Sequence, residues 1–166
     1  MTVSGFAQEI DRSGRSFYEE MAMRAHHPGV ARIFRTLAEE EDDLLRRHQT
    51  LPLETGEGEV ETFDRSINVF EELRQREDQL RVDSDIAAYR LAMEAEQELL
   101  RNYRRAARNE KHPASKAVLS RIIKDEVMHL REIESLYDFV NAPNHYLAWG
   151  EFSNVGEYRN FGRDLV

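Results

Sequence analysis

The segments HPGVARIFRTLAEEEDDLLR (residues 27–46) and HPASKAVLSRIIKDEVMHLR (residues 112–131) are two copies of one pattern, 85 residues apart. The repeat extends outward without a gap, and several residues recur at the same offset: Ala7, Tyr18 and Ala22 correspond to Ala92, Tyr103 and Ala107. A period this long exceeds that of a solenoid repeat, which is about 20–50 residues. We therefore predict one helical hairpin present twice, forming the two halves of a single bundle.

Apolar residues at spacings of three and four predict the helices of both hairpins. Proline disfavours helix in the residue before it, so the short breaks at Pro28 and Pro113 separate the helices of each pair. Breaks this short make the two helices antiparallel neighbours. The predicted long helices cover residues 3–26, 29–50, 84–109 and 113–141.

The connection between the hairpins is long, as a bundle with one crossover requires. Residues 51–83 begin with a glycine-rich acidic loop and include a weaker apolar pattern that predicts a helix over 63–81. The segment 143–166 is rich in aromatic residues but has no clean helical period. Because aromatic side chains are costly to expose, we expect this tail to pack on the bundle or on a partner subunit. The expected fold is all-α, with a four-helix bundle in residues 1–142.

Composition excludes several functional classes. The net charge of −9 argues against a nucleic-acid-binding surface. The sequence contains no cysteine, which excludes disulfides, iron–sulfur clusters and thiolate zinc sites. No apolar run is long enough to predict a membrane span. The first ten residues lack the basic and apolar regions of a signal peptide, so a cytoplasmic location is expected.

Three glutamates lie within apolar helical stripes that must face inward: Glu41, Glu96 and Glu126. Buried carboxylates are costly unless they are paired or bind a cation. His129 follows Glu126 by three residues, which places both side chains on one face of a helix. Asp11 lies on the inner face of the first helix. These residues predict a metal site built from carboxylates and imidazole.

Metal-free interpretations remain open beside this one. A single Glu-x-x-His pair is common by chance, and the inward glutamates would also be satisfied by tyrosine or arginine. Tyr18 and Tyr103 are expected to be core residues whose hydroxyl groups bond to buried carboxylates. Three histidines have no partner in the pattern and are expected to be structural: His26, His48 and His145. His27 and His112 precede prolines at helix breaks and are expected to be surface or capping residues.

The chain resembles the rubrerythrin-like branch of the ferritin-like di-iron superfamily over nearly its whole length. That family uses a glutamate on each of the first and third helices and Glu-x-x-His on the second and fourth. The resemblance implies that the metal ligands are Asp11, Glu41, Glu96, Glu126 and His129. Tyr18 and Tyr103, each seven residues after a helix-one or helix-three ligand, also fit the family pattern.

Two positions depart from the family pattern. Asp11 is one methylene shorter than the glutamate of the family, and Leu44 stands where the first histidine would be. His48 lies one turn beyond Leu44, about 6 Å along the helix, and would substitute only with rearrangement. We therefore expect the position served by Glu126 and His129 to bind metal more tightly than the one facing Leu44.

The resemblance implies one or two iron ions, with zinc or manganese as substitutes, and a non-haem oxidoreductase, peroxidase or ferroxidase. The alternative is a metal-binding or scaffold bundle that has lost redox chemistry. Without cysteine, electrons would come from a separate donor. The aromatic tail and the weaker helix favour self-association, for which a two-fold homodimer is the commonest closed form.

Overall fold

The computed structural model describes residues 2–51, 68–76, 80 and 82–158, with side chains described as far as residue 143. The described residues form helices and no strand, as the sequence predicted. The helices are α1 (Val3–Arg24), α2 (Pro28–Gln49), α3 (Val69–Gln75), α4 (Asp85–Asn109) and α5 (Pro113–Tyr158).

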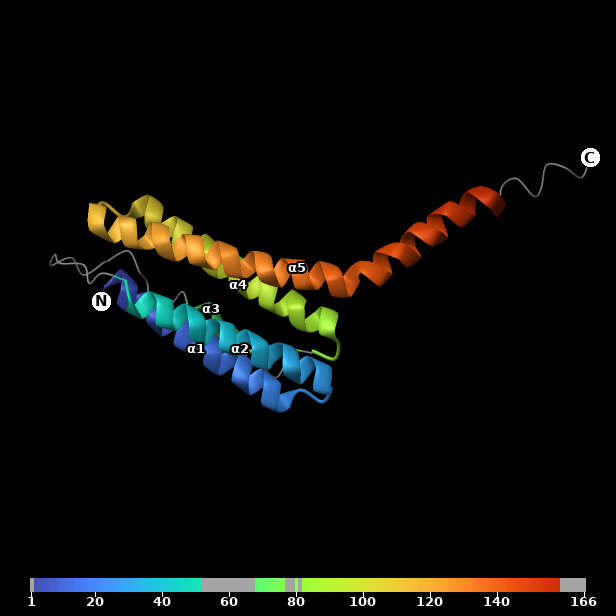
Figure 1. The fold of residues 1–166 in the computed structure, drawn as a ribbon, viewed down its shortest axis with the longest axis horizontal. Coiled ribbons are helices and arrows are strands. Elements are labelled where there is room, and N and C mark those ends of the chain that lie inside the picture. The colour runs from blue at the N-terminus through green and yellow to red at the C-terminus, as the bar shows by residue number, and fades with distance from the viewer. Residues whose placement is uncertain (1, 52–67, 77–79, 81, 159–166) are drawn as a thin grey trace, which may run out of the picture.

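The four long helices form the predicted pair of hairpins (Figure 1). Helix α1 packs along α2, and α4 packs along α5. In Figure 1, α2 ends at one end of the bundle and α4 begins at the other. The chain therefore passes from one end of the bundle to the other between α2 and α4, and the described part of this connection includes α3. This is the four-helix bundle of two hairpins expected from the repeat.

The helix starts have local causes in the sequence. Thr2 caps α1, because its hydroxyl oxygen accepts a hydrogen bond from the Gly5 amide at 3.1 Å. Ser84 caps α4 through the Ala87 amide at 3.2 Å. Pro28 begins α2, where its missing N–H costs nothing. The observed ends lie within two residues of the predicted ones for the first three long helices.

Helix α3 is shorter than the helix predicted over 63–81. It begins where the Asn68 side chain accepts hydrogen bonds from the Phe70 and Glu71 amides, at 3.2 and 3.3 Å. Residues 63–67, 77–79 and 81 of the prediction lie outside the described residues. The apolar pattern that suggested a longer helix is used instead to bury Phe70 completely.

Helix α5 was predicted to end near residue 141 but continues through Pro143 to Tyr158. A proline inside a helix removes one hydrogen bond and bends the helix without necessarily ending it. Figure 1 shows α5 changing direction as it leaves the bundle. Packing of the tail on a partner subunit stays a prediction. Among the described residues, no helix combines the length and apolarity that crossing a bilayer requires.

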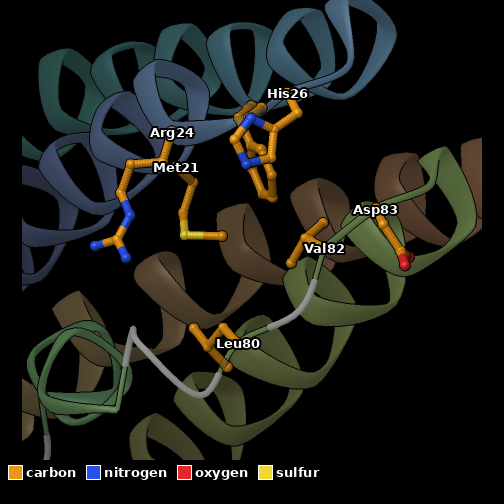
Figure 2. Close-up of a pocket in the computed structure, with 8 residues that line it drawn as sticks. Met21, Arg24, His26, Leu80, Val82 and Asp83 are labelled. Atoms are coloured by element: carbon orange, nitrogen blue, oxygen red, sulfur yellow. The ribbon is translucent and has the colours of Figure 1, made fainter.

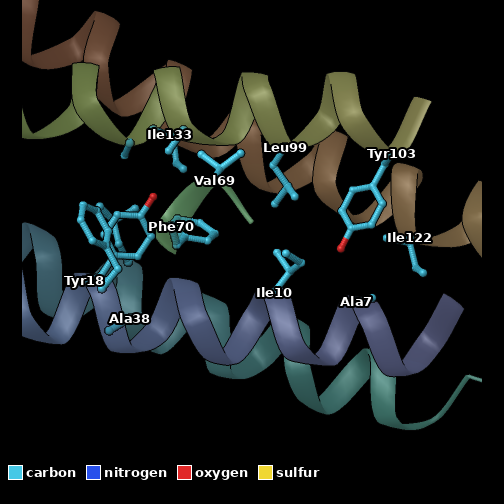
Figure 3. Close-up of a cluster of buried hydrophobic side chains, with 14 of the residues drawn as sticks. Ala7, Ile10, Tyr18, Ala38, Val69, Phe70, Leu99, Tyr103, Ile122 and Ile133 are labelled. Atoms are coloured by element: carbon cyan, nitrogen blue, oxygen red, sulfur yellow. The ribbon is translucent and has the colours of Figure 1, made fainter. Parts of the chain in front are cut away.

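The core lies between the two hairpins, where α1 faces α4 (Figure 3). Val69 and Phe70 of α3 reach into this space. Phe70 packs against Phe17 and Tyr18, with ring centroids 5.9 and 5.6 Å apart. The aromatic cluster closes one region of the core, while Tyr103 lies farther along the bundle. Polar residues on the same inner faces are therefore enclosed by apolar side chains.

Candidate metal centre

Six buried polar side chains from the four long helices converge in the core. They form two sets, in each of which one ligand atom per residue lies within 4.8 Å of the others. We name these sets the Asp11 group (Asp11, His48, Glu126) and the Glu41 group (Glu41, Glu96, His129). No member is more than 3% exposed. All five ligands predicted from the sequence are brought together, and His48 joins them.

Each of the six residues has one buried polar atom without a hydrogen-bond partner among the described residues. An unsatisfied buried polar atom costs about 1–3 kcal/mol, and more when it is charged. Six in one place are far too many for a packed core to carry without compensation. The unpartnered atoms are Asp11 Oδ1, Glu41 Oε1, His48 Nε2, Glu96 Oε2, Glu126 Oε1 and His129 Nδ1. Carboxylate oxygen with imidazole nitrogen is a donor set that fits iron, zinc or manganese.

When no cation is bound, burial raises the pKa of each carboxylate of the site above its ordinary value. Burial is the main cause of the raised pKa of Glu41, and the negative charges of Glu96 and Glu126 raise that pKa further. The pKa of Glu126 is raised well above its ordinary value by burial and then by the charges of Glu96 and Asp11. A bound cation lowers the pKa of both glutamates, since it stabilises the ionised carboxylates.

His129 is held by a carboxylate at the edge of the site. Its Nε2 lies 3.1 Å from Oε2 of the half-buried Glu40, and its Nδ1 lies 3.8 Å from Glu41 Oε1. An ionised carboxylate only accepts hydrogen bonds, so Nε2 carries the proton in that pairing. Nδ1 then keeps its lone pair on the side of the buried carboxylates, as in metal-binding histidines whose other nitrogen is bonded to a carboxylate.

His48 was expected to be structural because the sequence pattern showed no partner for it. That premise is wrong, because the structure gives His48 a partner. Its side chain is fully buried, and its Nδ1 lies 2.7 Å from Asp11 Oδ2. The sequence held one signal for this position: His48 follows Glu41 by seven residues, two helical turns along the same face. Leu44, between them, is also fully buried.

Glu126 and His129 were expected to serve one metal position, but they fall in different groups. Residues three apart on a helix differ in direction by about 60° and in height by about 4.5 Å. This divergence lets the two side chains of α5 lie on opposite sides of the site. The expected asymmetry in ligands is also absent, since each group contains two carboxylates and one imidazole.

The two repeat-related tyrosines differ in their contacts. The Tyr18 hydroxyl donates to Glu96 Oε1 at 2.9 Å, as predicted. The Tyr103 hydroxyl has no hydrogen-bond partner among the described residues, contrary to prediction. Its counterpart acceptor would be Asp11, which is shorter than Glu96 and has Oδ2 engaged by His48. The repeat symmetry is therefore broken at this end of the site.

Gly14 makes room for one of the carboxylates. A Cβ atom at this position would lie 2.8 Å from Glu41 Cδ and Oε2, and 2.9 Å from Phe70 Cε2. Such distances are too short for real contacts, so only glycine allows Glu41 to lie this close to α1. The corresponding residue of the second repeat is Leu99, a buried residue of the core. The sequence pattern alone did not single out Gly14.

A separate hollow of about 420 Å³ lies where α1 and α2 meet the segment before α4 (Figure 2). None of the six site residues lines it. Phe34 on its wall stacks on Tyr18, whose hydroxyl bonds to Glu96, so aromatic contacts link the hollow to the site. The polar side chains on its wall come from Arg24, His26 and Asp83, which form no set of metal ligands.

A protein-family model described as Rubrerythrin matches residues 4–137 of the chain. The matched region includes all six site residues. No curated protein and no solved structure gave a match.

Proposed function

The chain belongs to the rubrerythrin family, and from that premise we propose that it is an iron protein whose buried centre supports oxidation chemistry. Iron is held by Asp11, Glu41, Glu96, Glu126 and His129. The reaction class is that of a non-haem oxidoreductase acting as a peroxidase or ferroxidase. Iron, once bound, supplies a reversible one-electron change to oxygen or peroxide.

The single observation that carries the proposal is the set of six unpartnered buried atoms. Four of them belong to carboxylates, and desolvation and mutual repulsion raise the pKa of Glu41 and Glu126. A di- or trivalent cation would satisfy all of these atoms at once and offset the repulsion. In the metal-free alternative, tyrosine or arginine would satisfy the carboxylates; among the described residues, the hydrogen bond from Tyr18 to Glu96 is the one such contact to the site.

The surrounding residues orient the ligands. The Tyr18 hydroxyl holds one oxygen of Glu96 and leaves the other without a protein partner. Glu40 accepts a hydrogen bond from the Nε2–H of His129 and so keeps Nδ1 directed toward the site. These contacts reduce the freedom of the ligands before metal arrives, which lowers the entropic cost of binding.

The chain has no cysteine with which to hold a second redox centre. We therefore propose a separate electron donor. We also propose a cytoplasmic location and a homodimer in which the C-terminal part of α5 contacts the partner. The projection of α5 beyond the bundle supports the last point (Figure 1).

The test begins with metal-free protein, to which Fe(II) is added under argon. Bound iron per chain is measured, and oxygen or hydrogen peroxide is then mixed in while Fe(II) oxidation is followed. Glu96→Gln should lose the iron held by the Glu41 group. The matched control is Glu94→Gln, the same change on an exposed residue of the same helix, which should bind iron normally. Failure of the unaltered protein to bind iron would refute the proposal.

A second candidate is a metal-binding bundle without redox activity. The observation favouring it is the fully buried Leu44, an apolar side chain at the position where the family places a ligand. Bound iron that is oxidised no faster than free Fe(II) by either oxidant would select this candidate. Faster oxidation would select the oxidoreductase.

A further inference from the structure

We propose that His48 takes the place of the imidazole missing at Leu44, so that the Asp11 group is a complete second metal position beside the Glu41 group. This inference rests on the proposed function and adds to it the number of ions bound and the ligand set that holds the second one.

The first argument is the state of the His48 ring. The side chain is fully buried, with Nδ1 bonded to Asp11 Oδ2 at 2.7 Å and Nε2 without a partner among the described residues. With Asp11 ionised, Nδ1 holds the proton and Nε2 keeps the lone pair. A carboxylate that fixes one ring nitrogen while the other is free is the arrangement of a histidine prepared to bind metal.

The second argument is that two departures from the family pattern compensate each other. Asp11 carries its carboxylate one methylene closer to α1 than a glutamate would, a difference of about 1.3 Å. The ring of His48 already lies at hydrogen-bond distance from that carboxylate. In a close-packed core, a longer side chain at position 11 would meet the ring. The short acid and the displaced histidine therefore fit together.

The third argument is the balance of donors between the two groups. The Asp11 group and the Glu41 group each offer two carboxylates and one imidazole, all buried. His48 enters from one helical turn beyond Leu44, so the second position is displaced along α2 without losing its nitrogen ligand. Equal donor sets predict two ions of comparable affinity.

The main experiment measures metal content and binding with Fe(II) under argon and, separately, with Co(II). We expect about two ions per chain in the unaltered protein and about one in His48→Gln, since one of the two imidazoles is lost. The matched control is His112→Gln, which changes an exposed histidine and should keep both ions. Circular dichroism establishes that each variant retains its helical content.

Leu44→His in the otherwise unaltered protein gives a complementary test. If His48 already serves the second position, the new histidine adds no further ion. An additional ion in Leu44→His would overturn the inference, because it would mean that the position lacked a ligand.

A spectroscopic measurement tests the same point without any substitution. In the Co(II)-loaded protein, an imidazole bound to metal gives a strongly shifted exchangeable N–H proton signal in NMR. We expect two such signals, from His48 bonded to Asp11 and from His129 bonded to Glu40. One signal alone would contradict the assignment.

The outcomes separate this inference from the proposed function. Absence of any bound metal in the unaltered protein would defeat both. Binding that is lost in His129→Gln but unchanged in number and affinity in His48→Gln would defeat the inference and leave the proposed function standing. Loss of one ion in each of these variants would support both.

Discussion

Replacement of Gly14 by alanine tests whether Glu41 lies against α1. Alanine is normally favoured over glycine inside a helix by about 1 kcal/mol. At this position the new Cβ would meet Glu41 at 2.8 Å and Phe70 at 2.9 Å. Both side chains are buried, and Phe70 is held by Phe17 and Tyr18. Relief therefore requires movement in a packed core.

Overpacking of this kind costs about 1–3 kcal/mol. After the gain in helix propensity is subtracted, we expect Gly14→Ala to lower the free energy of unfolding by up to about 2 kcal/mol. Urea unfolding of the metal-free protein measures this difference. The same change should weaken metal binding, because the displaced Glu41 carboxylate leaves the Glu41 group.

The matched control is Gly29→Ala, in the first turn of α2. A Cβ there would lie 3.1 Å from Asp85 Oδ1, the end of an exposed side chain that can move aside. Gly29→Ala should be neutral or slightly stabilising. If Gly14→Ala instead stabilises the protein by about 1 kcal/mol, as propensity alone predicts, and metal affinity is unchanged, the close approach of Glu41 to α1 is refuted.

Three further predictions concern protonation, the tyrosine pair and assembly. Burial raises the pKa of Glu41 and Glu126 in the folded protein, so the folded state binds more protons than the unfolded state above about pH 4.5. The metal-free protein should therefore become less stable as the pH rises from there through the raised pKa values; urea unfolding across pH measures this, and an equal slope in Glu126→Gln would refute the cause. Tyr18→Phe should lower metal affinity, because it removes the hydrogen bond to Glu96. Tyr103→Phe removes a hydroxyl that has no partner among the described residues, so it should leave the metal-free protein as stable or more stable. Equal effects of the two changes on metal affinity and on stability would contradict the asymmetry. Sedimentation at micromolar concentration should give a dimer, and truncation before the projecting part of α5 should give a monomer; a monomeric full chain would refute the proposed assembly.

The repeat and the hydrophobic periodicity were enough to predict two hairpins, their crossover and the inward positions of Glu41, Glu96 and Glu126. These features are local or depend on helical spacing, which is a fixed property of the backbone. The inward glutamates stood out because a charged residue within an apolar stripe is costly, wherever the stripe is finally buried. The family resemblance added the proposed function and the expected metal.

Other features depended on which helices face each other. His48 looked isolated because its partner Asp11 lies 37 residues earlier, on a different helix. Gly14 resembled any helical glycine until Glu41 was found against it. The sequence likewise did not decide whether α5 continues past Pro143, because proline either ends a helix or bends it, according to what surrounds it. Sequence spacing sets where side chains lie on one helix, whereas contacts between helices depend on the rotation and height at which the helices pack, and these are decided only in the folded bundle.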